Sequence, residues 1–293
     1  MSPRRAVCYT TKAMTVPFHQ RFVALAAERS ALCVGIDPSA DSLTGWGLPD
    51  DAEGLQVFCE RMVEVCAPLV ACVKPQSAFF ERHGPAGMAV LRSAVEAAQS
   101  HGALVIIDAK RGDIDSTAAA YGDAFLGRQS AFGGDAMTLS AYLGFGSLAP
   151  IVERARRKAA GLFVVVCSSN PEGRELQQAR MPDGRSVAEH LADQIAAANA
   201  TDGGRALGLI GAVVGATLGR EAADLAARLP NSLLLVPGIG AQGATIADVR
   251  RDFGIHYPRV IPALSRAIAR AGPRAEDLRR EVERRIAEIR DGD

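Results

Sequence analysis

Eight short apolar runs recur along the chain, each rich in β-branched residues and each followed by a turn and an alanine-rich amphipathic segment. The runs cover residues 32–36, 69–73, 104–107, 136–139, 162–166, 209–214, 233–236 and 260–261. They are apolar throughout rather than alternating, as are strands buried on both faces of a parallel sheet. With a helix expected over about 18–29 and another after the last run, the pattern predicts a single (β/α)8 TIM barrel with extra N-terminal and C-terminal helices. An open doubly wound sheet is the alternative.

The length of 293 residues is compatible with two domains or with one barrel. No linker or composition shift marks a boundary, so we expect one barrel domain over residues 17–293. Residues 1–16 are polar and patternless, and we expect them to form a disordered N-terminal extension. The balance of 33 basic and 33 acidic residues argues against a protein that coats nucleic acid or binds membranes through a polybasic surface.

The cellular location of the protein and its need for a metal can be judged from motifs that the sequence lacks. It has no apolar stretch long enough to span a membrane and no apolar core of a secretory signal near its start. None of its six cysteines forms a C-x-x-C pair, and its five histidines are scattered, so neither a zinc site nor a disulfide framework is expected. These features predict a cytoplasmic protein without a metal.

Charged residues follow the first three runs. Asp37 follows the first and Lys74 the second, and the third leads into Asp108-x-Lys110-x-x-Asp113. Asp108 and Lys110 are expected on the same side of their strand, because side chains alternate with a period of two. Any one of these residues alone could form a surface ion pair. Together they predict a catalytic mouth, because stability gains little from desolvating so many charges.

Glycines follow the seventh run in the pattern Gly238-x-Gly240-x-x-Gly243. A dinucleotide-binding loop would be followed by a strand ending in an acid, and the next run ends without one. We therefore expect a phosphate loop between the seventh and eighth strands, with Gln242 and Arg266 reaching the anion. The remaining alternative is a tight turn with no ligand.

Six motifs, in this order, resemble the orotidine 5′-phosphate decarboxylase family, in its bacterial branch with longer loops, from about Phe18 to Ala271. The motifs are Gly35-Ile-Asp37-Pro, the segment Val73–Glu81, the segment Asp108–Thr117, Ser169-Asn-Pro171, Pro237-Gly-Ile-Gly-Ala-Gln242-Gly243 and Ser265-Arg266. The resemblance implies a cofactor-free and metal-free barrel that converts orotidine 5′-phosphate to uridine 5′-phosphate and carbon dioxide, the last step of de novo pyrimidine synthesis.

The resemblance also implies a role for each site residue. Lys110 would donate the proton to the carbon that loses the carboxylate, and Asp108 would lie beside that carboxylate and hold Lys110. Asp113 would complete the catalytic charged array, and both it and Thr117 would reach the site from the partner subunit of a homodimer. The remaining roles are ribose binding by Asp37 and Lys74, base contact by Ser169, and phosphate binding by Gln242 and Arg266. Two residues depart from the family pattern: Asp115, where a small residue is usual, and Ser265, where glycine is common.

Three other functions remain possible from the residues. A sugar-phosphate lyase or synthase of the same superfamily would share Asp-x-Lys-x-x-Asp but use Mg²⁺ and carry an acid after the second strand, where this chain has Lys74. An NAD-type oxidoreductase would use the Gly238 loop. A non-catalytic phosphate sensor would need neither Lys110 nor Asp113.

Overall fold

The structure, a computed structural model, describes residues 16–203, 206–240 and 242–290. Except for Val16, the expected disordered extension over residues 1–16 lies outside the described residues, as does Cys8. Among the described residues, no helix is both long and apolar enough to cross a membrane.

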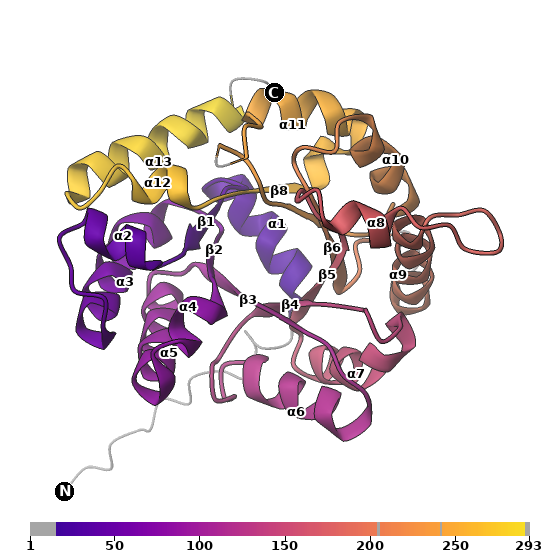
Figure 1. Cartoon of the computed structure of the whole chain (residues 1–293), viewed down its shortest axis with the longest axis horizontal. Coiled ribbons are helices and arrows are strands. Elements are labelled where there is room, and N and C mark those ends of the chain that lie inside the picture. Colours follow the sequence, from indigo (N-terminus) through magenta and orange to yellow (C-terminus); the bar gives the residue numbers. More distant parts are fainter. Residues whose placement is uncertain (1–15, 204–205, 241, 291–293) are drawn as a thin grey trace, which may run out of the picture.

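Eight parallel strands close into a barrel in their order along the chain, which confirms the predicted fold (Figure 1). The barrel closes where β8 pairs with β1, with Leu264 beside Val34. All eight strands are almost wholly buried, as the uninterrupted apolar runs predict. Their bounds are β1 Cys33–Ile36, β2 Cys72–Pro75, β3 Leu104–Arg111, β4 Ala136–Leu139, β5 Gly161–Cys167, β6 Ile210–Val214, β7 Leu234–Val236 and β8 Val260–Leu264.

The strand ends differ from the apolar runs at two places that matter for the site. The second run was expected to begin at Leu69, but Ala67–Leu69 forms a 3-10 turn with Pro68 in its first positions, and β2 continues to Pro75. The third strand runs on to Arg111, so that Asp108 and Lys110 lie inside β3 rather than after it. The polar residues that follow the second and third apolar runs, Lys74, Asp108 and Lys110, are therefore part of strands β2 and β3.

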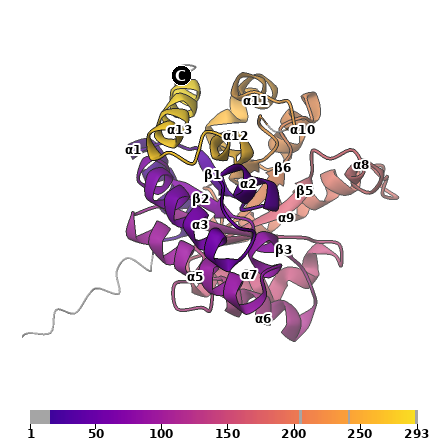
Figure 2. The ribbon, with the colours of Figure 1, turned by 60° about the vertical axis from the view of Figure 1, so that its left-hand side comes forward.

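Apart from α1, the helices surround the barrel on its outside (Figures 1 and 2). The α-helices are α1 Phe18–Glu28, α2 Ala40–Gly45, α3 Ala52–Cys66, α4 Ser77–Glu81, α5 Gly84–Ser100, α6 Asp115–Phe125, α7 Ala149–Arg157, α8 Gly173–Gln177, α9 Val187–Gly203, α10 Arg220–Arg228, α11 Ile246–Phe253, α12 Arg266–Ala269 and α13 Ala275–Arg290. The predicted C-terminal helix is α13, which buries Leu278, Val282, Ile286 and Ile289 on one face.

The predicted N-terminal helix, α1, lies across the end of the barrel where the strands begin (Figure 1). Phe18 packs edge-on against Phe163 of β5, with ring centroids 5.8 Å apart. Gly161 leaves room for this contact, because a Cβ there would lie 2.6 Å from the Phe18 ring. The amino-terminal end of the barrel is thus covered, and a site is left at the opposite end, where strands of such barrels carry their functional groups.

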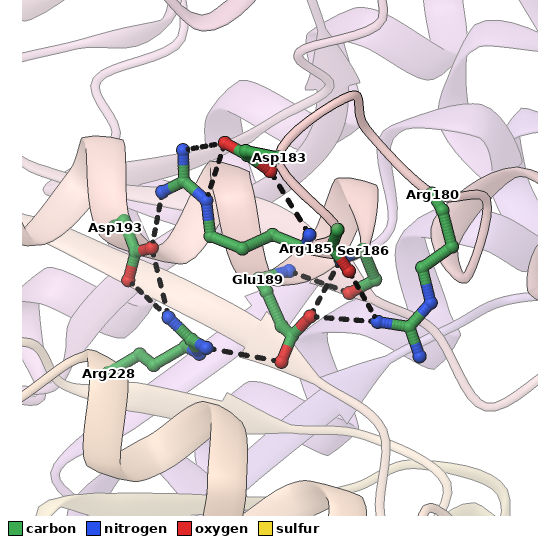
Figure 3. A network of polar contacts seen from close by, with 8 residues as sticks. Arg180, Asp183, Arg185, Ser186, Glu189, Asp193 and Arg228 are labelled. Atoms are coloured by element: carbon green, nitrogen blue, oxygen red, sulfur yellow. Dashed lines mark hydrogen bonds and ion pairs between the residues drawn. The ribbon is translucent and has the colours of Figure 1, made fainter.

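The connection from β5 to α9 projects beyond the ring of helices and is tied back by ion pairs (Figures 2 and 3). Arg185 lies 2.6 Å from Asp193 of α9, and Arg228 of α10 lies 3.0 Å from the same carboxylate. Glu189 accepts contacts from Arg228 at 3.2 Å and Arg180 at 3.5 Å. These contacts anchor the projecting segment to the outer helices α9 and α10.

Candidate active site

A cavity of about 280 Å³ opens at the carboxyl ends of the strands. Seven of the nine predicted site residues line it, and they come from strands or loops all around the barrel. They are Asp37, Lys74, Asp108, Lys110, Ser169, Gln242 and Arg266. The predicted convergence of these residues on one mouth is confirmed for these seven.

The charged residues form a connected array centred on Asp108. Lys74 Nζ lies 2.8 Å from Asp108 Oδ2, and Lys110 Nζ lies 2.6 Å from Asp108 Oδ1. The side chains of Lys74 and Asp108 are 8% and 9% exposed, whereas that of Lys110 is 48% exposed. One carboxylate therefore holds two ammonium groups in place, one buried and one open to the cavity and solvent.

The array shifts the ionisation of its own members. Burial alone would raise the pKa of Asp108, but the charges and hydrogen bonds of Lys74 and Lys110 outweigh it and hold that pKa well below its usual range. Burial likewise opposes the charge on Lys74, yet Asp108 and then Asp37 raise the pKa of this lysine above its ordinary value. Asp108 is thus ionised and Lys74 protonated at neutral pH.

Lys110 is held in an unusual backbone conformation. Its φ is +47°, in the left-handed region that non-glycine residues seldom adopt. The pairing of β3 with β4 is irregular between Ile107 and Arg111, so the ladder is interrupted where Lys110 lies. The predicted meeting of Asp108 and Lys110 is confirmed, but through this distortion rather than through a regular strand.

Two cavity residues near the array have no role in the sequence-based prediction. Gln76 Nε2 donates to the backbone oxygen of Asp108 at 3.1 Å. Thr138 of β4 contacts both Asp108 and the backbone of Lys110. The available signals were the Lys74-Pro-Gln76 segment and the lone hydroxyl in the run Ala136–Leu139. Neither signal, taken alone, distinguishes a site residue from a strand residue.

The glycine loop after β7 forms the opposite side of the cavity. Gly238, Gly240 and Gly243 all have positive φ values, of +105°, +75° and +92°. The φ of Gly238 is one that residues with a Cβ seldom adopt, so this turn favours glycine. Ser169 donates a short hydrogen bond to Oε1 of Gln242.

Arg266 lies beside this loop, directly after β8, and its side chain is exposed. Among the described residues it has no hydrogen bond or ion pair from its guanidinium, so the group can bind an anion in the cavity. Ser265, one of the two departures from the family pattern, packs its Cβ against Gly35, where a second Cβ would lie only 2.5 Å away. The fold therefore accommodates Ser265 because residue 35 is glycine.

Asp113 and Thr117 do not line the cavity. Asp113 Oδ1 accepts a hydrogen bond of 2.8 Å from the backbone N–H of Ile114, and Thr117 is exposed on α6. The second departure, Asp115, is also exposed and has a φ of +45°. Within one chain, the segment after β3 thus turns away from the array.

The geometry also bears on the alternative functions. A closed sheet has no point at which the strand order reverses, which is where open α/β sheets bind dinucleotides. The position where an Mg²⁺-dependent relative would carry an acid holds the ammonium of Lys74, 2.8 Å from Asp108. Across the described residues, no three His, Cys, Asp or Glu side chains are grouped to hold a metal ion.

Comparison with known proteins decides the family. Residues 30–280 match the orotidine 5′-phosphate decarboxylase / HUMPS family. This chain belongs to that family. The orotidine 5′-phosphate decarboxylase of Myxococcus xanthus is 50% identical over 274 residues, covering 94% of this chain and 95% of that protein. That of Streptomyces coelicolor is 51% identical over 275 residues, covering 94% and 97%.

Solved structures of family members agree with this assignment. The candidate orotidine 5′-phosphate decarboxylase of Streptomyces avermitilis superposes with a TM-score of 0.90 at 49% identity, covering 97% of this chain and 98% of that one. The OMP decarboxylase of Leishmania donovani superposes with a TM-score of 0.76 at 32% identity, covering 92% and 96%. The barrel is therefore that of the family over nearly the whole chain.

Proposed function

We propose that the protein decarboxylates orotidine 5′-phosphate to uridine 5′-phosphate in pyrimidine synthesis. The observation that carries the proposal is the cavity that places the Asp108 array on one side and the glycine loop with Arg266 on the other. A site for a nucleotide needs both sides of such a cavity. One side must bind the phosphate anion, and the other must offer polar and charged groups to the ring and the sugar.

The reaction breaks the bond between a ring carbon and its carboxylate. Carbon dioxide leaves without the electron pair, which stays on the ring carbon until that carbon takes a proton. Lys110 is the proton donor, because its ammonium faces the cavity and is fixed 2.6 Å from Asp108 Oδ1. Its 48% exposure lets water return the proton after each turnover.

Several effects must act together. Enzymes lower barriers by about 8–23 kcal/mol, and one charge pair at 4 Å supplies roughly 4 kcal/mol at an effective dielectric of 20. Lys110 stabilises the developing negative charge from a position fixed before substrate binds. Asp108 lies beside the departing carboxylate, and binding of the remote phosphate by Gln242 and Arg266 contributes binding energy to the reaction. Asp37 and Lys74 hold the ribose hydroxyls, and Ser169 contacts the base.

The active species is proposed to be a homodimer in which Asp113 and Thr117 complete the partner's site. The surface beside Asp113 supports this, because it exposes the large apolar side chains of Ile114 (52%), Tyr142 (78%) and Leu143 (56%). The two loops that carry them are joined by a hydrogen bond of 2.9 Å from Ser140 N to Arg111 O. Large exposed apolar side chains on neighbouring loops are typical of an interface.

Mixing two inactive variants tests the shared site. Lys110→Ala and Asp113→Ala chains are refolded or co-expressed together, and activity is compared with that of each alone. In a mixed dimer one site keeps both residues, so activity should return. Activity that stays at the level of the parents, or a monomer in sedimentation, would refute the partner's contribution.

A cytoplasmic location is part of the same proposal. The five cysteines of the described residues are all free and buried, as in proteins of reducing compartments. Fractionation of cells that express the protein would check this location.

The decisive assay adds orotidine 5′-phosphate to the purified protein and follows the loss of orotate absorbance. The absorbance should fall, uridine 5′-phosphate should appear, and a chelator should leave the rate unchanged. Loss of activity with the chelator would favour the Mg²⁺-dependent alternative. A stable absorbance, with nicotinamide fluorescence changing on titration, would favour an oxidoreductase.

A further inference from the structure

Thr138 occupies a special place among the cavity residues. It is 1% exposed and is the only polar residue of β4, Ala136–Leu139. Its Oγ1 lies 2.9 Å from the backbone nitrogen of Lys110 and 2.8 Å from Oδ1 of Asp108. One hydroxyl therefore joins the main chain of Lys110 to the side chain of Asp108.

The direction of both hydrogen bonds is fixed by chemistry. A backbone N–H can only donate, so Thr138 Oγ1 must accept from Lys110. The single hydroxyl proton is then free for Asp108, whose ionised carboxylate can only accept. Asp108 Oδ1 thus receives two donors, the hydroxyl of Thr138 and the ammonium of Lys110. The two donors favour the charged form of Asp108. Each of the two hydrogen bonds of Thr138 can run in only one direction.

The hydroxyl of Thr138 also bonds to the backbone where the strand pairing is irregular. The β3–β4 ladder loses its regular register between Ile107 and Arg111, so Lys110 has no register partner in β4, and its N–H donates to the hydroxyl of Thr138. Lys110 has the left-handed φ of +47°, which costs a non-glycine residue free energy and persists only where its surroundings hold it. The bond from Lys110 N to Thr138 is a contact that can hold it.

We propose that Thr138 is a positioning residue of this site, which holds Lys110 and Asp108 in the geometry for proton delivery through its two hydrogen bonds. This inference rests on the proposed function. Thr138 acts through Lys110 and Asp108, and its hydroxyl is already used by both, so it is not assigned a contact with substrate. Its β-branched side chain has few rotamers, which suits a fixed support.

Two substitutions separate the hydroxyl from the shape of the side chain. Thr138→Val keeps the shape and removes the hydroxyl, and Thr138→Ser keeps the hydroxyl and removes a methyl group. Because hydrogen bonds to charged groups are strong, Thr138→Val should lower kcat about 10- to 100-fold. The Kd for uridine 5′-phosphate should stay within about three-fold, because the ribose and phosphate contacts remain. Thr138→Ser should keep most of the wild-type kcat.

The outcomes are distinct. A Thr138→Val enzyme with wild-type kcat overturns the proposal, and so does a Thr138→Ser enzyme as slow as Thr138→Val. A parallel loss of nucleotide binding and melting temperature would show a merely structural role. If the wild-type protein does not decarboxylate orotidine 5′-phosphate, the proposed function fails by itself. A crystal structure of Thr138→Val then decides: Lys110 should leave the left-handed region and separate from Asp108, and an unchanged Lys110 refutes the inference.

Discussion

The two sides of the cavity differ in how completely they are assembled without substrate. At the end formed by β2, β3 and β4, every oxygen of the Asp108 carboxylate is occupied, by Lys74, Lys110 and Thr138 at 2.6–2.8 Å. At the end formed by the β7 loop and α12, Gln242 bonds to Ser169, and the guanidinium of Arg266 has no partner among the described residues. The groups at the reacting end are thus already held in place, whereas the guanidinium at the phosphate end is free to bind an anion.

This difference matches what each end must do. A group that stabilises a developing charge works best when it is already oriented, because no reorganisation is then needed during the reaction. A group that binds a remote part of the substrate contributes by closing on it, and that binding energy can serve the chemical step. The two ends should therefore respond differently to substitution.

The largest effect is expected at the preassembled end. Lys110→Ala removes the proton donor, so kcat should fall by about 10³-fold or more. The phosphate contacts lie across the cavity, and the Kd for uridine 5′-phosphate should change little. Steady-state kinetics and calorimetric titration check the two parts. Near-normal turnover would show that Lys110 is not the donor.

Substitution at the phosphate end should affect binding and chemistry together. Arg266→Ala removes a charge-assisted contact to the phosphate and should lower kcat/KM by about 100-fold, with KM raised and kcat reduced. The same variant should show no loss with orotidine, which lacks the phosphate. An effect limited to the melting temperature would count against a phosphate role for Arg266.

A smaller effect concerns stability at acid pH. The pKa of Asp108 is lower in the folded protein than in the unfolded chain, so its stabilising contribution is present above the unfolded pKa, near about 4, and is lost as the pH falls below it. The free energy of unfolding of wild type minus that of Asp108→Asn should therefore be flat from pH 7 to about 5 and fall below about 4. Denaturant titrations measure this difference.

A control comes from the phosphate end. The substitution Gln242→Ala removes no titrating group. The free energy of unfolding of wild type minus that of Gln242→Ala should therefore stay flat over the same pH range. If the Asp108→Asn difference were also flat through acid pH, the lysines would not hold the carboxylate ionised as described.

Much of the fold could be predicted from the sequence because the strands of a closed parallel sheet are apolar on both faces. Asp37 and Lys74 could be assigned to the mouth because each directly follows an apolar run, and Arg266 because it comes shortly after the eighth run, near the glycine loop. The first residue of β2 could not be predicted, because it depends on the 3-10 turn that contains Pro68 and follows the preceding helix.

The contacts inside the site were less accessible to sequence reasoning. The role of Thr138 depends on an irregular β3–β4 register and on the left-handed conformation of Lys110, neither of which has a local sequence signal. The bond between Ser169 and Gln242 joins residues 73 positions apart. Asp113 and Thr117 lie outside the cavity of one chain, and their predicted role across a dimer remains a prediction.

The most direct test of a preassembled reacting end and an available phosphate end is a crystal structure with uridine 5′-phosphate bound. The phosphate should lie on Arg266 and Gln242, with Gln242 released from Ser169, and the ring should face Lys110. Distances from Asp108 to Lys74 and Lys110 should change by less than about 0.5 Å, the tolerance of a preorganised site. A phosphate bound away from Arg266, or an array that assembles only with ligand, would contradict the account.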